Sequence, residues 1–308
     1  MNRQASEERA DFAEGVAWVD GEYVPISEAK IPILDWGFLH ADVTYDVTHV
    51  WQGSFFRLED HLDRFERSCK ALRLSGSPDC DHVRAVLMQC VRLSGLRDAY
   101  VEMVCTRGRP APGSRDPRSC TNTFLAFAVP FVWIFTPEQQ ERGCHLIVSN
   151  VQRIPPESLD PRVKNYHWGD LTRGLFDAYD RGGETVVLVD SKGNITEGPG
   201  FNVFAVVGGI IRSPGGTVLE GITKLTVGEL CEELGYRIQP GPVAPEELLL
   251  ADEVFLSSTA GGIMPVTRVD DATIGNGQPG TVTTTLKELY WAKHRQGWHA
   301  TAVGYDDE

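Results

Sequence analysis

The sequence predicts a mixed α+β fold made of two domains. Segments with the two-residue periodicity of strands and segments with the spacing of amphipathic helices both occur, without the regular strand–helix–strand repetition of a parallel α/β protein. At 308 residues the chain can form two domains of ordinary size, each with a core of its own. We expect a small N-terminal domain over residues 1–133, an interdomain linker over 134–142 and a large cofactor-binding domain over 143–308.

The charge balance excludes several classes of partner. The chain has 43 Asp and Glu against 29 Lys and Arg, a formal net charge of −14. A nucleic-acid binder needs a basic stripe to neutralise phosphates, and none is visible. The first fifteen residues are polar, unlike a secretion signal, and the most apolar run, 124–135, is broken by Pro130 and too short to cross a bilayer. We therefore expect neither nucleic acid nor a membrane as a partner.

The cysteines favour a reducing compartment. There are seven, an odd number, and none forms a C-x-x-C pair, which argues against a disulfide framework or a zinc site. The eight histidines also lack metal-ligand spacing, so we expect no metal. We expect the protein to be cytoplasmic.

The N-terminal half reads as a sheet with two helices. Asp20-Gly21 is a two-residue hairpin turn, and Leu62, Phe65 and Cys69 have the spacing of a helix face. The stretch 108–122 is rich in Gly, Pro, Arg and Ser and predicts a long mobile loop. The other predicted elements are strands at 44–51 and 100–107, a helix at 81–94 and a buried strand beginning at 124.

The C-terminal half alternates short strands with three helices. Gly208-Gly209 is a hairpin turn, and Gly182 and Gly235 end helices. The predicted strands lie at 146–151, 185–189, 201–207, 210–212, 252–258 and 263–269, and the helices at 168–179, 223–234 and 282–294.

Lys164 is the first candidate for chemistry. Only seven lysines are present, and most lie in charged helices or at turn tips, whereas Lys164 lies among aromatic and polar residues in the segment DPRVKNYHWGDLTRG. Partial burial keeps a lysine amine neutral enough to form a Schiff base. A solvated surface lysine is the competing interpretation.

Two glycine-rich segments add candidate ligand contacts. Glu197 lies in NITEGPGFN, where the glycines allow a ligand to approach the backbone, although a surface turn explains the same pattern. Gly221 opens a helix whose first amides, those of Ile222 and Thr223, form an anion site. The segment STAGG, with Thr259, offers a second cluster of hydroxyls and amides, and Arg64 on the first helix could add a bidentate charge. Taken separately, a capped helix, a glycine turn and a surface arginine explain these three features equally. Motifs for dinucleotides, P-loops and nucleophile elbows are absent from the sequence.

Taken together and in this order, these segments resemble the branched-chain and D-amino-acid aminotransferase superfamily, the fold-type-IV enzymes that use pyridoxal 5'-phosphate. The resemblance covers about residues 16–291. It rests on H-L-x-R ending at Arg64, K-N at Lys164, T-E-G-x-G-F-N around Glu197, G-I-T at Gly221 and S-T-A-G-G around Thr259.

The resemblance implies a role for each matched residue. Lys164 looks like the lysine that forms the Schiff base and shuttles the proton, and Glu197 looks like the partner of the pyridine nitrogen. Arg64, Ile222, Thr223 and Thr259 look like the phosphate cup. The family also implies a homodimer.

A narrower likeness is to the (R)-selective amine transaminases. It rests on the segments ILDWGFLHADVTYDV, YVEMVCTRG, LDPRVKNYHWGDLTRGLFDA and VLEGITK. In that group the matching positions line the substrate pocket: His40, Tyr45, Val47, Tyr100, Glu102 and Trp168. An arginine of the mobile loop binds the acceptor's carboxylate, and Arg115 is the candidate, with Arg109 and Arg118 as alternatives. The chain departs from its relatives at Trp36, where Gln is common, and at Gly169, near the place of a tyrosine in branched-chain enzymes.

These features predict a ping-pong transaminase that moves an amino group from a primary (R)-amine to a keto acid such as pyruvate. A pocket with Glu102 and Tyr45 but no fixed arginine would disfavour binding of a donor's α-carboxylate. The alternative is that Glu102 only makes a structural hydrogen bond. The alternatives are a branched-chain or D-amino-acid aminotransferase, a lyase of the aminodeoxychorismate type, and a catalytically silent binding module. Retention of both Lys164 and Glu197 argues against the last.

Overall fold

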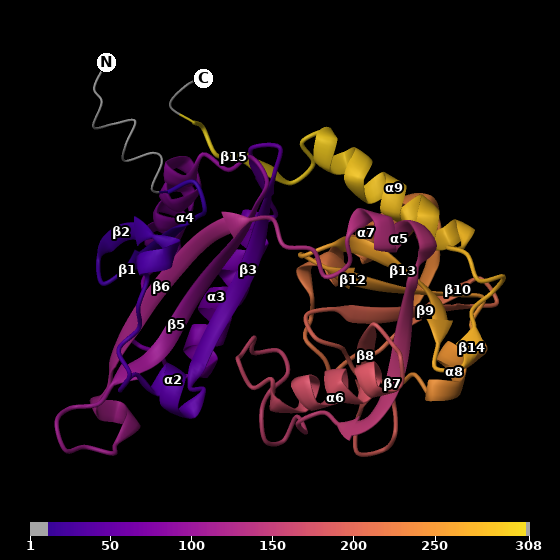
Figure 1. Cartoon of the computed structure of the whole chain (residues 1–308), viewed down its shortest axis with the longest axis horizontal. Coiled ribbons are helices and arrows are strands. Elements are labelled where there is room, and N and C mark those ends of the chain that lie inside the picture. The colour runs from indigo at the N-terminus through magenta and orange to yellow at the C-terminus, as the bar shows by residue number, and fades with distance from the viewer. Residues whose placement is uncertain (1–11, 306–308) are drawn as a thin grey trace. The chain divides into compact units, whose positions relative to one another are not determined.

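The computed structural model describes residues 12–305, which form two compact units (Figure 1). The first unit contains residues 12–132, Val163–Tyr166 and 294–305; the second contains Trp133–Arg162 and His167–Lys293. Two segments of the sequence range 143–308, one of them carrying Lys164, thus belong to the first unit. The predicted mixed α+β fold is confirmed.

The first unit is built on an antiparallel sheet whose strands follow the order β15-β4-β3-β5-β6-β1-β2. β3 and β5 are long neighbours, and they pair from Val43 opposite Thr106 to Val50 opposite Ala99. The strand bounds are β1 Val16–Val19, β2 Glu22–Pro25, β3 Val43–Trp51, β4 Ser54–Phe56, β5 Ala99–Arg109, β6 Thr121–Pro130 and β15 Ala300–Ala302.

Two long helices bury their apolar faces against this sheet. α3 (Leu58–Ala71) and α4 (Cys80–Ser94) bring Leu62, Phe65 and Leu87 into one core with strand residues such as Met103. α4 begins at the N-cap Asp79 and ends at Gly95, which adopts the left-handed conformation that glycine tolerates. Three short elements complete the unit: α2 (Trp36–His40) and the 3-10 turns Ile26–Glu28 and Pro117–Ser119.

The loop predicted at 108–122 is shorter than expected. β5 continues to Arg109 and β6 starts at Thr121, because the ladder passes a register shift between Thr106 and Arg109. Gly108 makes this possible: its φ is +77° and a Cβ there would lie 1.6 Å from the carbonyl oxygen of Thr121. The strand β6 is also less buried than predicted, since only Ala126 and Ala128 are fully inside.

The second unit contains a mixed sheet in the order β11-β10-β9-β12-β13-β7-β8, with β14 beside β13. The pairs β10–β11, β13–β7 and β7–β8 are parallel and the others antiparallel. The strand bounds are β7 Cys144–Gln152, β8 Thr185–Val189, β9 Asn202–Val207, β10 Ile210–Ser213, β11 Arg237–Pro240, β12 Glu253–Ser258, β13 Gly262–Val269 and β14 Ala272–Thr273.

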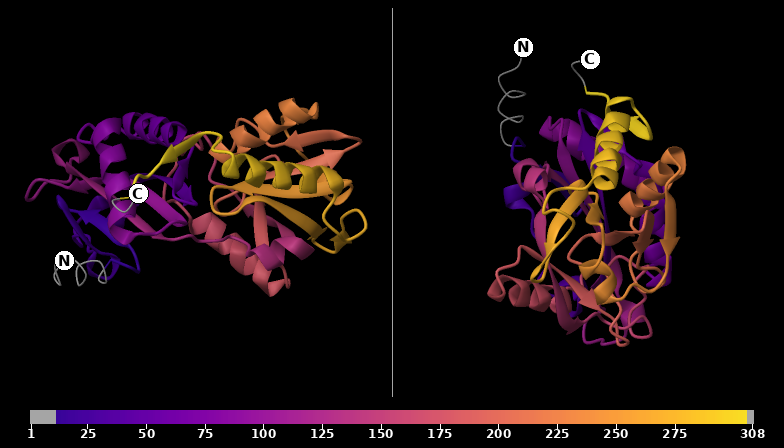
Figure 2. Two further views of the ribbon diagram at one scale, coloured as in Figure 1. Left: turned by 90° about the horizontal axis from the view of Figure 1, so that it is seen from above. Right: turned by 90° about the vertical axis from the view of Figure 1, so that its right-hand side faces the viewer.

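Strand periodicity divides the apolar residues of this sheet between two cores. Val186 and Leu188 of β8 face α6 (Gly169–Asp180), whereas Val187 and Val189 belong to the larger core with β9, β12 and β13. Gly174 lets α6 approach closely, because a Cβ there would lie 2.5 Å from Leu188. The other helices are α5 Pro137–Arg142, α7 Ile222–Leu234, α8 Pro245–Leu249 and α9 Thr281–Arg295, the yellow helix in Figure 2.

Most predicted elements are found, with differences at a few places. The stretch 134–142, expected as an interdomain linker, contains α5, whose N-cap Thr136 and Gln139 form a capping box. Besides α5 and the two 3-10 turns, five elements were not predicted, namely α2, α8, β11, β14 and β15. All of these are short elements. β11 and β15 become strands only by pairing with β10 and β4, which lie elsewhere in the chain, whereas α2 and α8 have local caps.

Candidate functional site

The segment carrying Lys164 is hydrogen-bonded to β3 in the first unit. The carbonyl oxygen of Lys164 accepts bonds from Thr44 Oγ1 at 2.6 Å and from the amide of Tyr45 at 3.3 Å. Thr44 and Asn165 form an antiparallel bridge beside them. These bonds hold Lys164 in a short segment pinned to a sheet, and its Nζ lies 4.2 Å from the centroid of the Tyr45 ring, within cation–π range.

Tyr45 belongs to a wall of apolar and aromatic residues beside this amine. Val43, Tyr45 and Val47 of β3 cluster with Val104 of β5, and Tyr100 packs against them. The ring of Tyr166 lies 4.3 Å from that of Tyr45, centroid to centroid. The structure therefore brings together five of the residues predicted from the sequence: Lys164, Tyr45, Val47, Tyr100 and Glu102.

Glu102 is a buried carboxylate on this wall. It lies opposite Val47 in the β3–β5 ladder, and only 6% of the residue is exposed. Tyr100 donates its hydroxyl to Oε2 at 2.9 Å, and Tyr166 donates its hydroxyl to Oε1. Burial raises the pKa of Glu102, while the bonds from Tyr166 and Tyr100 and the charge of Lys164 act in the opposite direction.

Arg64 is held by a buried acid of β3, Asp46. Its Nε donates to Asp46 Oδ2 at 2.7 Å and its Nη2 to Oδ1 at 2.8 Å, while His61 Nδ1 lies 2.8 Å from Oδ1. Burial opposes ionisation of Asp46, but the charge and bonds of Arg64, with the bond to His61, hold its pKa well below its usual range. The guanidinium thus has a fixed direction.

His40, another predicted residue of the first unit, lies on the short helix α2 with Trp36, the position where the chain departs from its relatives. His40 ends α2, where its ring meets that of Trp36 at 4.6 Å. Asp35 caps this helix by accepting from the amide of Gly37 and from Thr106 Oγ1, which ties α2 to β5. His40 and Trp36 thus contact each other at the two ends of α2.

The three candidate arginines near the loop differ in their surroundings. Arg115 is exposed between Ser114 and Asp116, and Arg109 is the exposed last residue of β5. Arg118, by contrast, pairs with Asp116 at 2.6 Å. Hydrogen bonds also connect residues within the loop; for example, Ser119 Oγ donates to Ser114 Oγ at 2.8 Å.

Glu197 is the centre of a buried ion network in the second unit. Its Oε1 accepts from Arg153 Nε at 3.1 Å and its Oε2 from the amide of Leu219 at 3.0 Å. Arg153 also donates to Asp170 at 2.8 Å. Burial lowers the pKa of Arg153, but the charges and bonds of Glu197 and Asp170 outweigh it, so the pKa is raised. A carboxylate has further acceptor positions beyond these two bonds, so Glu197 can still accept from a ligand.

The start of α7 has the geometry of an anion site. Its N-cap Gly221 has no side chain to bond the first amides, which leaves those of Ile222 and Thr223 without a capping oxygen from that residue. A Cβ at Gly221 would lie 2.2 Å from Asn202 Oδ1, so glycine is needed there. Asn202 in turn donates to the carbonyl of Leu219 at 2.9 Å.

Two loops of the second unit complete the predicted set. Ser258 Oγ donates to the carbonyl of Gly200 at 2.7 Å, which joins the turn containing Thr259 to the loop that follows Glu197. Trp168 precedes α6 and packs on its core, and a Cβ at Gly200 would lie 3.9 Å from its ring. Trp168, Thr259 and the Glu197 loop therefore lie close together within this unit.

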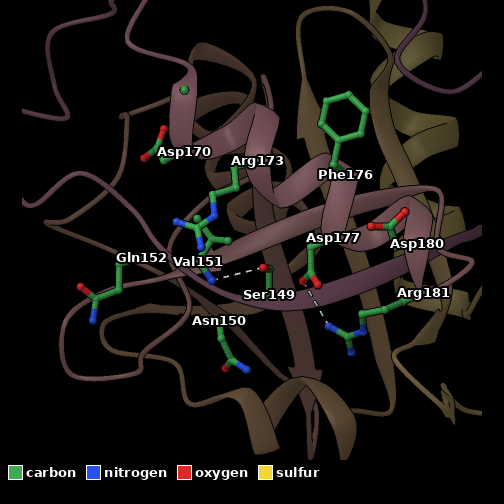
Figure 3. Close-up of a pocket in the computed structure, with 11 residues that line it drawn as sticks. Ser149, Asn150, Val151, Gln152, Asp170, Arg173, Phe176, Asp177, Asp180 and Arg181 are labelled. Atoms are coloured by element: carbon green, nitrogen blue, oxygen red, sulfur yellow. Dashed lines mark hydrogen bonds and ion pairs between the residues drawn. The ribbon is translucent and has the colours of Figure 1, made fainter.

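A separate open groove of 1130 Å³ lies between α6 and β7 (Figure 3). Ser149 and Asn150 of β7 form one side, and Arg173 and Phe176 of α6 form the other. None of its eleven described lining residues is a site residue predicted from the sequence. Asp170 links the groove to the Glu197 network, through Arg153.

Several of these residues were not predicted from the sequence. Tyr166, Arg153 and Asp46 hold predicted residues in place, and Asp170 holds Arg153; the partners lie 17 to 64 positions apart in the sequence. Tyr166 and Asp170 lie in the quoted segment around Lys164 and Asp46 lies in ILDWGFLHADVTYDV, whereas Arg153 had no such local signal. Within residues 12–305, no cluster of three or more His, Cys, Asp or Glu has the arrangement of a metal site. In the same range, no helix is both long and apolar enough to cross a membrane.

The sequence matches the family model of class IV aminotransferases over residues 44–269. A putative branched-chain-amino-acid aminotransferase of Methanocaldococcus jannaschii is 32% identical over 276 residues, which are 89% of this chain and 94% of that protein. The branched-chain-amino-acid aminotransferase of Escherichia coli is 28% identical over 283 residues, covering 89% of this chain and 91% of the relative.

Solved structures agree with the sequence relatives. The T.th. branched-chain amino acid aminotransferase with pyridoxamine 5'-phosphate superposes with a TM-score of 0.87 at 27% identity, covering 95% of this chain and 100% of that chain. The E. coli enzyme gives a TM-score of 0.88 at 25% identity, covering 94% and 99%. The family match spans most of the chain and includes Lys164, Glu197 and the start of α7. This chain belongs to the class IV aminotransferases.

Proposed function

We propose that this aminotransferase uses pyridoxal 5'-phosphate to move an amino group from a primary (R)-amine to a keto acid such as pyruvate. The observation that carries the donor class is Glu102, a buried carboxylate on the same wall as Tyr45 and Lys164. An amino-acid donor brings an α-carboxylate, and two like charges in a desolvated pocket repel each other strongly. An uncharged amine substituent meets no such penalty.

The residues present fit the cofactor. In the second unit, the amides of Ile222 and Thr223 at the uncapped start of α7 suit a phosphate, and Thr259 offers a hydroxyl; in the first unit, Arg64 offers a guanidinium. Glu197, with an acceptor position to spare, suits a protonated ring nitrogen. The cofactor supplies the electron sink that stabilises negative charge on the donor carbon.

The protein side of the reaction follows from these positions. Lys164 holds the cofactor through its amine and, once displaced by the donor, moves a proton away from the donor carbon. The bonds from Thr44 and Tyr45 to its carbonyl oxygen fix the backbone from which it swings. Arg153 and Asp170 hold Glu197 in the orientation that keeps the ring nitrogen protonated.

The acceptor and the assembly are parts of the same proposal. Arg115 is the candidate for binding the keto-acid carboxylate, because Arg118 already pairs with Asp116. His40, Val47, Tyr100 and Trp168 are proposed as further pocket residues, residues 143–308 as the main cofactor-binding domain, and a homodimer as the assembly.

A branched-chain amino acid is the second candidate donor. It is favoured by the relatives, which are named branched-chain-amino-acid aminotransferases at 32% and 28% identity. On this view the two tyrosine bonds to Glu102 are structural only.

A donor panel separates the two candidates. We expect turnover of (R)-1-phenylethylamine over its (S) enantiomer, with pyruvate as acceptor and a Lys164→Ala control that is inactive. L-leucine with 2-oxoglutarate tests the branched-chain alternative. Turnover confined to amino acids contradicts the amine proposal.

A further inference from the structure

Both oxygens of Glu102 are engaged by phenols from different parts of the chain. Tyr100, two residues earlier on the same face of β5, donates to Oε2 at 2.9 Å. Tyr166, two residues after Lys164, donates to Oε1. The carboxylate is therefore tied on one side to its own strand and on the other to the segment that carries the reactive amine.

The charges around Glu102 decide whether it stays an acceptor. Burial favours its neutral form, and the charge of Asp46 acts in the same direction. The hydroxyls of Tyr166 and Tyr100 and the charge of Lys164 favour the anion. Burial together with the Glu102 charge raises the pKa of both tyrosines, so they remain donors, and Tyr45 is the other titratable group beside them.

We propose that Tyr166 is a specificity-determining residue that acts through Glu102. Its hydroxyl keeps the carboxylate an acceptor on the pocket wall, and an acceptor cannot bond the α-carboxylate of an amino acid. Without that hydroxyl, Glu102 loses one of its two phenolic donors and retains its proton more readily. A protonated Glu102 can donate to a carboxylate. The inference deepens the proposed function and rests on it.

The hydroxyl of Tyr166 can be removed by a conservative substitution. The residue is 38% exposed, and Tyr166→Phe keeps the ring that lies 4.3 Å from that of Tyr45, so the substitution removes only the hydroxyl and its bond to Glu102. A hydrogen bond to a charged group, once lost, corresponds to about a tenfold or larger change in a preference ratio. We therefore expect Tyr166→Phe to lower the ratio of kcat/KM for (R)-1-phenylethylamine to that for D-alanine by about tenfold.

The experiment compares Tyr166→Phe with Tyr179→Phe, a tyrosine on α6 of the second unit that is 54% exposed and whose ring contacts Phe176. Both holoenzymes are assayed with 2-oxobutyrate as acceptor, across pH. The D-alanine activity of Tyr166→Phe should rise toward lower pH, as protonation of Glu102 requires. Phenylacetate binding, measured by calorimetry, should tighten in Tyr166→Phe and stay unchanged in Tyr179→Phe.

A double variant tests the route through Glu102. On a Glu102→Gln background, Tyr166→Phe should leave the donor ratio unchanged, because the charge it controls is gone. An unchanged ratio and unchanged phenylacetate binding in the single variant overturn the inference, while the proposed function stands. A wild-type enzyme that accepts only amino acids overturns the proposed function instead. If the single variant misfolds, the wild-type pH profile decides: the donor ratio must fall toward lower pH.

Discussion

Replacement of Arg153 by methionine should destabilise the second unit far more than loss of an ordinary surface ion pair. The guanidinium lies between Glu197 and Asp170, and the three side chains are only 12%, 8% and 10% exposed. Methionine keeps the length but leaves two buried carboxylates unpaired. Breaking a buried pair in this way costs about 3–5 kcal/mol. Because the network keeps some solvent access, we expect a loss near the lower end, about 3 kcal/mol of unfolding free energy.

The assay is urea unfolding at pH 7.5, with and without saturating cofactor, since a ligand bound only to the folded state adds stability of its own. The matched control is Arg162→Met, whose partner Asp160 forms an exposed pair, with side chains 73% and 40% exposed. That variant should unfold almost like the wild type. Adding Asp170→Asn to Arg153→Met should recover part of the loss. Equal effects of the two arginine substitutions, or a further loss in the double variant, would refute the reasoning.

Three further predictions concern the other parts of the site. Asp46→Asn should weaken binding of inorganic phosphate and cofactor about tenfold by releasing Arg64. The variant should also be less stable than the wild type above the usual Asp titration range, because the folded-state pKa of Asp46 lies below its unfolded value. This difference in unfolding free energy should shrink as the pH falls below about 4. A gap independent of pH would contradict this. Gly221→Ala should push Asn202 aside and lower stability by about 1–3 kcal/mol, seen as a lower Tm; an unchanged Tm would show that the contact relaxes freely. Arg115→Ala should raise KM for pyruvate about tenfold without changing KM for the amine, whereas the Asp116-paired Arg118 should tolerate alanine; the reverse result would move the role to Arg118.

The fold was most predictable where a periodic pattern coincided with a turn or cap. The hairpin over Asp20-Gly21 and the helix ended by Gly95 lie where local chemistry alone specifies them. β11 is different: Arg237–Pro240 is mostly exposed and too short to give a periodic signal, and it becomes a strand only because β10 offers a parallel partner. Edge strands of this kind are decided by their neighbours.

The candidate site was predictable where a motif lies within a few residues. Glu197 with its glycines and Gly221 with the start of α7 are such cases. The residues that orient them were not predictable, because Arg153 reaches Glu197 across 44 positions and Tyr166 reaches Glu102 across 64. An isolated arginine or tyrosine gives no signal of a partner that only the folded chain supplies.

The central claim is that Lys164 holds the cofactor. Borohydride reduction of the purified enzyme, followed by peptide mapping, should place the pyridoxyl label on Lys164 alone. The label should vanish in Lys164→Ala and persist in Lys192→Ala, where the lysine is at a turn tip. A label on any other lysine, or no label at all, would contradict the account.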